Sequence, residues 1–134
     1  MGLLDRIHHV GIAVSSIDEA LPLYRDRLKM NPGLRKKMES QGVEVQFFEL
    51  PGTVIELLAP LSKDTTLARF LSSHGSGMHH LAYEVSDIRA ALKELQDTGF
   101  DLIDEEPREG AEGKLVAFVH PRTMGGVLVE LQQK

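Results

Sequence analysis

The stretch Ile7–Leu21, IHHVGIAVSSIDEAL, returns later in the chain as Met78–Leu92, MHHLAYEVSDIRAAL. A shift that superimposes the two stretches aligns seven identical residues, and some of the other pairs are similar, such as Val10 with Leu81. Self-similarity of this length predicts a chain that is built from two copies of one structural module. The identical pairs are His8/His79, His9/His80, Val14/Val85, Ser15/Ser86, Ile17/Ile88, Ala20/Ala91 and Leu21/Leu92.

A second match supports the duplication. With a slightly different offset, Gly52–Leu57 (GTVIEL) falls on Gly126–Leu131 (GVLVEL). This match pairs Glu56 with Glu130, so each copy carries one glutamate inside an otherwise apolar run. The repeat therefore covers polar residues of both types, histidine and glutamate, and not only the hydrophobic pattern.

Each copy begins with a β-rich segment that is followed by serine and aspartate residues suited to cap a helix. In the first copy the cap candidates are Ser15, Ser16 and Asp18, and in the second they are Ser86 and Asp87. The helices are followed by turn residues, and further strands are expected after them. The predicted strands are 33–39, which is weakly signalled, 43–50 and 53–60 in the first copy, and 101–107, 114–120 and 126–132 in the second.

The pattern therefore predicts a β-α-β-β-β module twice over. The first module covers about residues 5–62 and the second about residues 76–134, joined by a linker with a short helix in TLARFLSSHG. We expect the two modules to form one α+β domain over residues 1–134, because a chain of this length is large enough for one core of its own.

Composition limits the function further. Of the 134 residues, 42% are hydrophobic and 26% charged, as in ordinary soluble globular proteins. A formal net charge of −5 argues against nucleic acid or an anionic membrane as a general partner. The absence of cysteine excludes disulfides, thiolate metal sites and a cysteine nucleophile. Apolar runs are too short for a membrane helix or a signal peptide, so we expect a cytoplasmic protein.

The duplicated polar residues predict a metal site. If the two modules pack about a pseudo-two-fold axis, His9 meets His80 and Glu56 meets Glu130, and all four side chains could converge on one point. Two imidazoles and two carboxylates suit a six-coordinate divalent ion with positions left for water. A lone carboxylate within an apolar strand is costly to bury unless it is paired or bound to metal. The predicted ligands are thus His9, Glu56, His80 and Glu130.

The other histidines are interpreted differently. Side chains alternate between the two faces of a strand, so His8 and His79 are expected to face away from their neighbours and to be structural. His74 and His120 have no duplicated partner and are interpreted as loop or rim residues.

Four stretches of the chain resemble the methylmalonyl-CoA epimerase family of the vicinal oxygen chelate (glyoxalase/bleomycin resistance) superfamily. They are RIHHVGIAV, TVIELLAPLSKDT, GSGMHHLAYEVSDI and EEPREGAEGKLVAFVHPRTMGGVLVELQ. The resemblance spans nearly the whole chain. It implies two tandem βαβββ modules that form a curved mixed sheet around a metal site. It also implies epimerisation of the 2R and 2S forms of methylmalonyl-CoA through an enolate, and a homodimer.

The resemblance also implies roles for individual residues. The family's metal ligands fall on His9, His80 and Glu130, and its fourth ligand on Glu56. The metal would be cobalt, manganese, nickel, magnesium or zinc, without a choice among them. Glu130 is the first candidate for an acid/base as well as a ligand.

One departure from the family pattern concerns the second acid/base. Some bacterial members carry a glutamate that is not a ligand at the position that matches Val45. Glu44 lies one residue away and should face the other side of its strand unless a bulge shifts it. The second acid/base is therefore left open, with Glu56 as an alternative.

An acyl-CoA substrate would bring several phosphates, which need basic partners. The candidates are Arg25, Arg27, Lys29, Arg35, Lys36, Lys37 and Lys114. A solvated helix face explains the charges on the first helix equally well.

Three other functions are compatible with the pattern to different degrees. A glyoxalase I-like lactoylglutathione lyase would use the same ligands and the same enolate chemistry, although the segment HP…GGVLVEL favours the epimerase. An extradiol dioxygenase would use two histidines and one carboxylate on iron. A small-molecule binding protein of the bleomycin-resistance kind would have the fold without the metal, and the presence of all four ligands argues against it.

Overall fold

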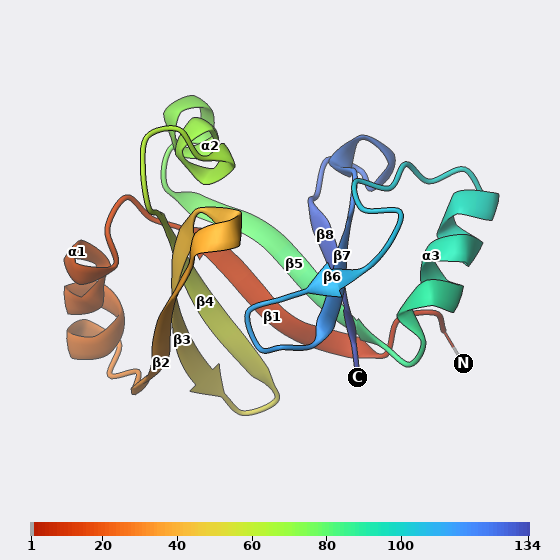
Figure 1. The fold of residues 1–134 in the computed structure, drawn as a ribbon. Coiled ribbons are helices and arrows are strands. Elements are labelled where there is room, and N and C mark those ends of the chain that lie inside the picture. Colours follow the sequence, from red (N-terminus) through yellow and green to blue (C-terminus); the bar gives the residue numbers. More distant parts are fainter. Residues whose placement is uncertain (1) are drawn as a thin grey trace. The chain divides into compact units, whose positions relative to one another are not determined.

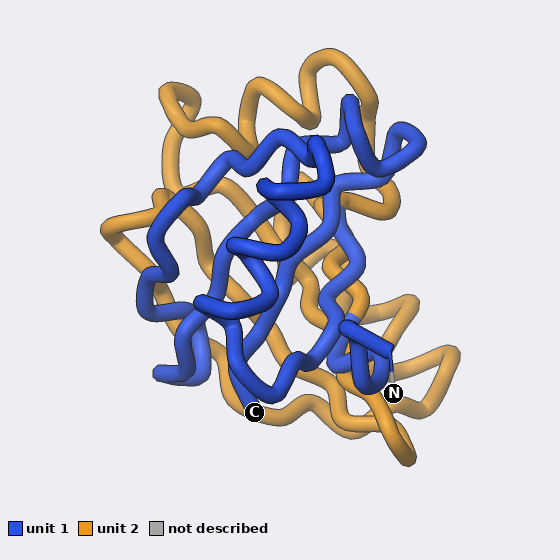
Figure 2. The backbone as a smooth tube through the Cα atoms, turned by 90° about the vertical axis from the view of Figure 1, so that its right-hand side faces the viewer, with its two compact units in different colours: residues 1–9, 80–134 blue, residues 10–79 orange. Residues whose placement is uncertain are grey.

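The computed structural model describes residues 2–134 and divides them into two compact units (Figure 2). Unit 1 comprises residues 2–9 and 80–134, and unit 2 comprises residues 10–79. Strand β1 (Arg6–Ala13) begins in unit 1 and ends in unit 2, whereas strand β5 (Gly77–Val85) begins in unit 2 and ends in unit 1. The single domain and the module limits stay predictions.

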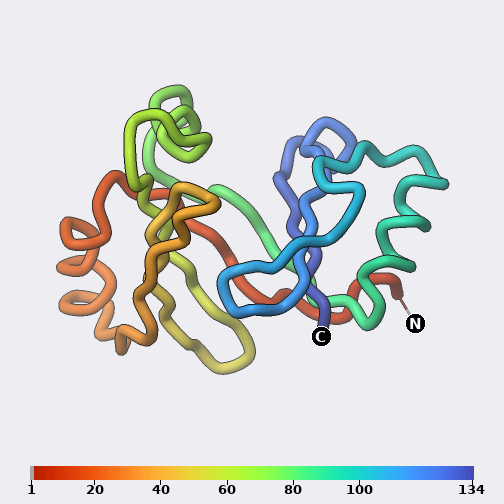
Figure 3. The backbone as a smooth tube through the Cα atoms, in the orientation of Figure 1, coloured from red at the N-terminus to blue at the C-terminus, as the bar shows by residue number. Residues whose placement is uncertain are grey.

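Unit 2 holds most of the first sequence copy. Its elements are the second half of β1, helix α1 (Ile17–Leu21) with a π-helical turn (Pro22–Arg27), β2 (Pro32–Met38), a 3-10 turn (Glu39–Gln41), β3 (Val43–Leu50), β4 (Thr53–Pro60) and helix α2 (Thr66–His74). The course of the chain through these elements can be followed in Figure 3. The predicted strands at 33–39, 43–50 and 53–60 are confirmed, with small differences at the ends.

The first helix starts and stops for local reasons. Of the expected caps, Ser16 is the one used, since its side chain accepts a hydrogen bond from the backbone N–H of Glu19. Proline at position 22 has no N–H to donate to the preceding turn, and the chain widens there into a π-helical turn. The backbone N–H of Leu28 accordingly donates to the carbonyl of Leu23, five residues earlier.

The sheet of unit 2 has one face covered by α1. Strands β2, β3 and β4 run antiparallel and lie side by side in Figure 1. The register places Phe47 opposite Glu56, so these two side chains share one face, whereas the neighbouring residues Phe48 and Leu57 share the other. Phe48 and Leu57 form the core with α1, and the ring of Phe48 stacks on Tyr24 at 5.8 Å between centroids.

Unit 1 holds most of the second copy. Its elements are the first half of β1, β5, helix α3 (Ile88–Asp97), β6 (Arg108–Glu109), β7 (Leu115–Val119), a 3-10 turn (Pro121–Thr123) and β8 (Val129–Gln133). The sheet is mixed, as predicted: β8 pairs parallel with β5 and antiparallel with β7 (Figure 1). Asp87 is the cap of α3, because its carboxylate accepts a hydrogen bond from the N–H of Ala90 at 3.1 Å.

The core of unit 1 lies between α3 and one face of this sheet. It is formed by buried aliphatic side chains of both elements and of the strand end that leads into the helix. These are Val85, Ile88, Ala91, Leu92, Ala117, Val119, Val129 and Leu131. Side chains alternate between the two faces of a strand, and the strand residues of this core occupy one face. The other face therefore carries residues 80 and 82 of β5 and residues 130 and 132 of β8.

The strand predicted at 101–107 is wrong. Apart from one isolated bridge between Leu102 and Val119, these residues form a loop, and only Arg108 and Glu109 are paired as a strand. The acidic side chains explain the difference: Asp104 uses its carboxylate to accept from the backbone N–H of Phe118 at 2.9 Å. A side-chain bond of this kind replaces a bond of the strand ladder.

The last strand begins later than predicted, at Val129 instead of residue 126. Gly125 and Gly126 have φ angles of 67° and 91°, a left-handed conformation that glycine adopts at little cost and that interrupts a strand. Within the described residues, no helix combines the length and the hydropathy that a membrane crossing requires.

Each core should be sensitive to truncation at its centre. We expect Leu57→Ala in unit 2 and Leu131→Ala in unit 1 each to lower the free energy of unfolding by about 2–5 kcal/mol, because both side chains are fully buried and leave a cavity. The control is Leu34→Ala, since that side chain is 61% exposed and should change stability by no more than about 0.5 kcal/mol. Urea unfolding followed by circular dichroism measures all three, and equal effects at the three positions would contradict this assignment of the cores.

Candidate metal centre

Three predicted ligands come together on three strands of unit 1. Nε2 of His9 on β1 lies 3.0 Å from Nε2 of His80 on β5. The two oxygens of Glu130 on β8 lie 3.4 Å from Nε2 of His9 and 3.5 Å from Nε2 of His80. Two imidazole nitrogens and one carboxylate thus point at one another from neighbouring strands.

Strand pairing explains this convergence. β5 and β8 are parallel with Ala82 opposite Glu130, and His80 lies two residues before Ala82 on the same face. On the other side of β8, Phe118 of β7 lies opposite Glu130, and its ring meets His80 edge-on at 5.5 Å between centroids. β1 is the neighbour of β5 in the sheet, and its N-terminal end is held by the bond from Asp5 N–H to the Glu84 carbonyl at 2.8 Å.

All three side chains are withdrawn from water. His9 is 2% exposed, His80 5% and Glu130 7%. A buried carboxylate needs hydrogen-bond donors or a cation near it, because the loss of hydration is otherwise not compensated. Phe118 and the neighbouring apolar side chain of Ala82 provide no such group.

The donor set fits a divalent metal ion. Two Nε2 atoms 3.0 Å apart need a proton or a cation between them, because their lone pairs otherwise face each other. Ligand atoms that bind one ion at about 2.0–2.2 Å lie about 3 Å apart, close to the three separations found here. Histidine nitrogen and glutamate oxygen suit zinc and the related divalent transition metals.

Glu56, the fourth predicted ligand, belongs to β4 in unit 2. It is buried on the strand face opposite the α1 core, the face it shares with Phe47 and Val45. A buried carboxylate on the face away from the core is consistent with the predicted role as a ligand, which stays a prediction.

His8 differs from its predicted orientation. Its ring does not turn away from His9: Nδ1 of His8 lies 2.9 Å from Nδ1 of His9, and the rings meet edge-on with centroids 5.1 Å apart. Nε2 of His8 lies 3.0 Å from Nε2 of Gln132 and 3.3 Å from Oε1 of Glu112. Burial, and next the neighbouring His9, lower the pKa of His8, which favours the neutral ring. The strict alternation expected from an ideal strand is therefore wrong for this pair.

His79, the duplicate of His8, lies in a different environment. Its ring meets Phe70 of α2 edge-on at 4.7 Å, and Phe70 also stacks on His74 at 4.4 Å. Burial lowers the pKa of His79. His74 is the last residue of α2, and His120 accepts a hydrogen bond from the Arg122 N–H in the turn before β8. The three rings thus contact Phe70, the Phe70 carbonyl and the Arg122 N–H, respectively.

Glu44 faces away from Glu56. Its strand register places it opposite Ala59, a residue of the α1 core, and its carboxylate accepts from Arg35 at 3.0 Å. Arg35 also donates to Asp18 at 2.7 Å and lowers the pKa of that carboxyl. The face of Glu56 instead holds Val45, so the expected one-residue offset of Glu44 is confirmed.

Gln132 and Glu112 are site neighbours that the sequence interpretation missed. Gln132 follows Glu130 by two residues and is also buried, so the alternation Glu130, Leu131, Gln132 placed it on the ligand face and could have identified it. Glu112 lies in a glycine-rich turn far from His8 in sequence, and no local pattern indicates its contact.

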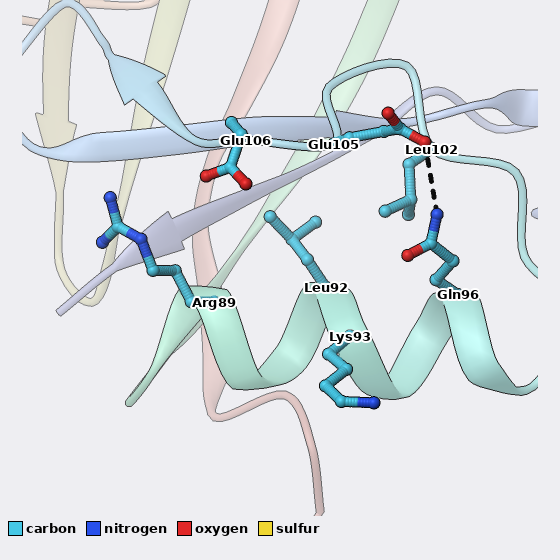
Figure 4. Close-up of a pocket in the computed structure, with 7 residues that line it drawn as sticks. All are labelled: Arg89, Leu92, Lys93, Gln96, Leu102, Glu105 and Glu106. Carbon is cyan, nitrogen blue, oxygen red and sulfur yellow. Dashed lines mark hydrogen bonds between the residues drawn. The ribbon is translucent and has the colours of Figure 1, made fainter.

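A shallow pocket is found elsewhere on unit 1, and Figure 4 shows its lining. It lies between α3 and the loop before β6, on the helix side of the sheet, and Gln96 donates to Glu105 across it at 3.3 Å. Leu92 at its base belongs to the α3 core, on the sheet face opposite the ligands. The residues that line this pocket do not include His9, His80 or Glu130.

Comparison with known proteins agrees with the fold. The sequence model of the glyoxalase/bleomycin resistance protein/dioxygenase superfamily matches residues 8–118. The chain is 41% identical to the ethylmalonyl-CoA/methylmalonyl-CoA epimerase of Cereibacter sphaeroides, over 98% of this chain and 99% of that protein.

Solved structures agree over the same length. The crystal structure of methylmalonyl-CoA epimerase from Mycobacterium tuberculosis matches with a TM-score of 0.92 at 36% identity, over 99% of this chain and 90% of that one. A methylmalonyl-CoA epimerase in complex with methylmalonyl-CoA and NH4+ also matches with a TM-score of 0.92, at 31% identity, over 98% of this chain and 95% of that one. The predicted glyoxalase-like fold is thereby confirmed, and the chain belongs to the glyoxalase/bleomycin resistance protein/dioxygenase superfamily and, within it, to the methylmalonyl-CoA epimerase family.

Proposed function

We propose that this protein is a metal-dependent epimerase that interconverts the 2R and 2S forms of methylmalonyl-CoA. The observation that carries the proposal is the buried cluster of His9, His80 and Glu130 in a chain that matches methylmalonyl-CoA epimerases over nearly its full length. The structural neighbour with bound methylmalonyl-CoA supports the choice of substrate. Glu56 is proposed as the fourth ligand, from its equivalence to Glu130 in the repeat.

The reaction requires that the C2 proton leave one face of the substrate and return to the other. A divalent ion held by these residues would supply a Lewis acid that stabilises the negative charge developing on the thioester oxygen. His9 and His80 hold their Nε2 atoms in fixed positions, because both rings are packed in the interior. The surrounding burial excludes water that would otherwise compete for the same positions.

Glu130 is proposed as a proton acceptor and donor. Its carboxylate takes the proton from C2, and the electron pair of the C–H bond moves into the enolate; return of a proton to the opposite face gives the other epimer. A second group is needed on that opposite face. Glu56 is proposed for it, because Glu44 is turned toward α1 and Val45 has no proton to exchange.

The basic residues expected to bind coenzyme A are not equivalent. Arg35 lies opposite Gln46, on the α1 face of the sheet, where it donates to Asp18 and Glu44. Arg25 donates to Asp26. Lys36 lies opposite Val45 and thus on the strand face of Glu56. We propose Lys36 as the residue of this segment that faces the acyl-CoA. The homodimer and the cytoplasmic location stay predictions.

Proton exchange at C2 is the first test. We expect the metal-loaded protein to incorporate one deuterium at C2 of methylmalonyl-CoA in heavy water, because abstraction and return each exchange the proton with solvent. Mass spectrometry follows the uptake, and a chelator should abolish it. Methylglyoxal with glutathione is assayed in parallel.

If lactoylglutathione forms and no deuterium is incorporated, the proposed epimerase activity is wrong and the protein is a lactoylglutathione lyase. If neither product forms with any of the five candidate metals, the proposed reaction is wrong and a binding protein becomes the alternative.

A second experiment tests Glu130 as the acid/base. We expect Glu130→Gln to slow deuterium exchange by about 10²–10⁴-fold, because the amide cannot take up the C2 proton. The matched control is Glu44→Gln, which changes the same functional group on the α1 face and should leave exchange unchanged. Exchange at the wild-type rate in Glu130→Gln would remove this residue from the role.

Metal binding should also stabilise the fold. Cobalt(II) at about 100 times its Kd should raise the free energy of unfolding by about 2.7 kcal/mol, because the ion binds the folded chain alone. His80→Leu should lose most of this gain, whereas His74→Leu, at the exposed end of α2, should keep it. Urea unfolding with cobalt(II) or with chelator measures the difference, and a wild-type protein that is equally stable in both would refute the metal centre.

A further inference from the structure

We infer that His8 is a positioning residue that fixes the tautomer of His9 in which Nε2 is free to bind the metal. The inference rests on the metal centre of the proposed function and adds a residue outside the ligand set. It is carried by a continuous line of close contacts in unit 1 that leads from the centre through His9 and His8 to Gln132 and Glu112.

The direction of hydrogen bonding along this line is constrained. A histidine that offers Nε2 to a metal and is neutral carries its proton on Nδ1. Nδ1 of His9 then donates to Nδ1 of His8, the atom 2.9 Å away, which must be unprotonated. His8 consequently carries its own proton on Nε2, where it needs an acceptor.

Two acceptors lie at that atom. The Glu112 carboxylate, which can only accept when it is ionised, has Oε1 3.3 Å from Nε2 of His8. The Gln132 amide lies 3.0 Å away and presents its nitrogen, but a half-turn of the amide presents the oxygen in the same place. Glu112 therefore favours the tautomer of His8 that the metal-bound state of His9 requires.

The opposite direction of hydrogen bonding is the alternative that Glu112 disfavours. If the Gln132 nitrogen donates to His8, then His8 donates to His9 from Nδ1, and the His9 proton moves to Nε2. That atom faces His80 at 3.0 Å and would no longer have a lone pair for a metal. Hydrogen bonds can thus be donated along this line in two directions, and only the one that starts at Nδ1 of His9 leaves Nε2 of His9 free to bind a metal.

The turn that carries Glu112 is held in place. The N–H of Gly110 donates to the Lys114 carbonyl at 2.8 Å, and the N–H of Gly113 donates back to the Gly110 carbonyl at 3.1 Å. A side chain at position 110 would meet Val116 at 2.7 Å, so glycine allows the turn to lie against β7. The backbone on either side of Glu112 is therefore held by these hydrogen bonds and lies against β7.

The repeat supplies a matched comparison. His79 is the duplicate of His8 and also precedes a predicted ligand, yet its ring packs on Phe70 of α2. Two histidines of equivalent origin therefore occupy different environments: the His8 ring contacts the His9 ring, and the His79 ring contacts Phe70.

The experiment measures cobalt(II) affinity by isothermal titration calorimetry in the full chain. His8→Leu should weaken binding about 10–100-fold, as expected when a partner of a metal-bound histidine is removed. His8→Asn places an amide oxygen near the position of the former Nδ1 and should restore affinity to within about threefold of wild type. His79→Leu should bind as wild type does. Unchanged affinity in His8→Leu, or equal weakening in His8→Asn and His8→Leu, would overturn the inference.

A spectroscopic readout separates positioning from a purely structural effect. In the zinc-loaded wild-type protein, long-range ¹⁵N–¹H correlation of the histidine rings should show His8 protonated on Nε2 and His9 on Nδ1. The reverse assignment would overturn the inference even if His8→Leu fails to fold. Both measurements are independent of epimerisation: absent deuterium exchange with these results intact would refute the proposed reaction alone, whereas a wild-type protein without cobalt binding would refute both.

Discussion

The separation of 3.0 Å between two buried imidazole nitrogens, with a carboxylate 3.4–3.5 Å from each, is the interaction on which the rest of this structure depends. Three groups rich in electron pairs cannot be held at this distance in a dry interior unless a proton or a cation lies among them. The strands around them must therefore supply rigidity. Parallel pairing of β8 with β5 and antiparallel pairing with β7 fix Glu130 from both sides.

The two faces of the unit 1 sheet carry different kinds of side chain: one is apolar and packs on α3, and the other carries His80 and Glu130. Alternate residues of β8 lie on opposite faces: Val129 and Leu131 pack on α3, whereas Glu130 and Gln132 lie on the face that carries His80. An apolar core on one face thus holds a polar cluster on the other. The same arrangement on β4 of unit 2 places Leu57 in the α1 core and Glu56 on the opposite face.

The sequence predicted the parts of this structure that depend on duplication and on period. The repeat identified His9, His80 and Glu130, because residues kept in both copies occupy equivalent strand positions. The caps Ser16 and Asp87 followed from local hydrogen bonding. The strand at 101–107 was predicted wrongly, because these residues form a loop in which the carboxylate of Asp104 accepts a hydrogen bond from the backbone N–H of Phe118. A side-chain hydrogen bond of this kind cannot be inferred from β propensity.

The orientation of His8 could not be predicted for a different reason. Period-two alternation describes an ideal strand, whereas the contact between His8 and His9 depends on partners that come from β8 and from the turn at residues 110–114. Those partners are distant in sequence. The duplicate His79 stands in the same His-His sequence, yet its ring packs on Phe70, because different residues surround it.

The line from His9 through His8 to Gln132 has a consequence for the dielectric behaviour of the interior. Its members carry no net charge when the rings are neutral, yet each is a dipole whose direction can be reversed by a proton shift or by rotation of an amide. If a cation binds at the proposed centre, such a line responds to its charge by reorientation, as solvent would. The protein thereby places reorientable dipoles of its own next to the buried cluster of His9, His80 and Glu130.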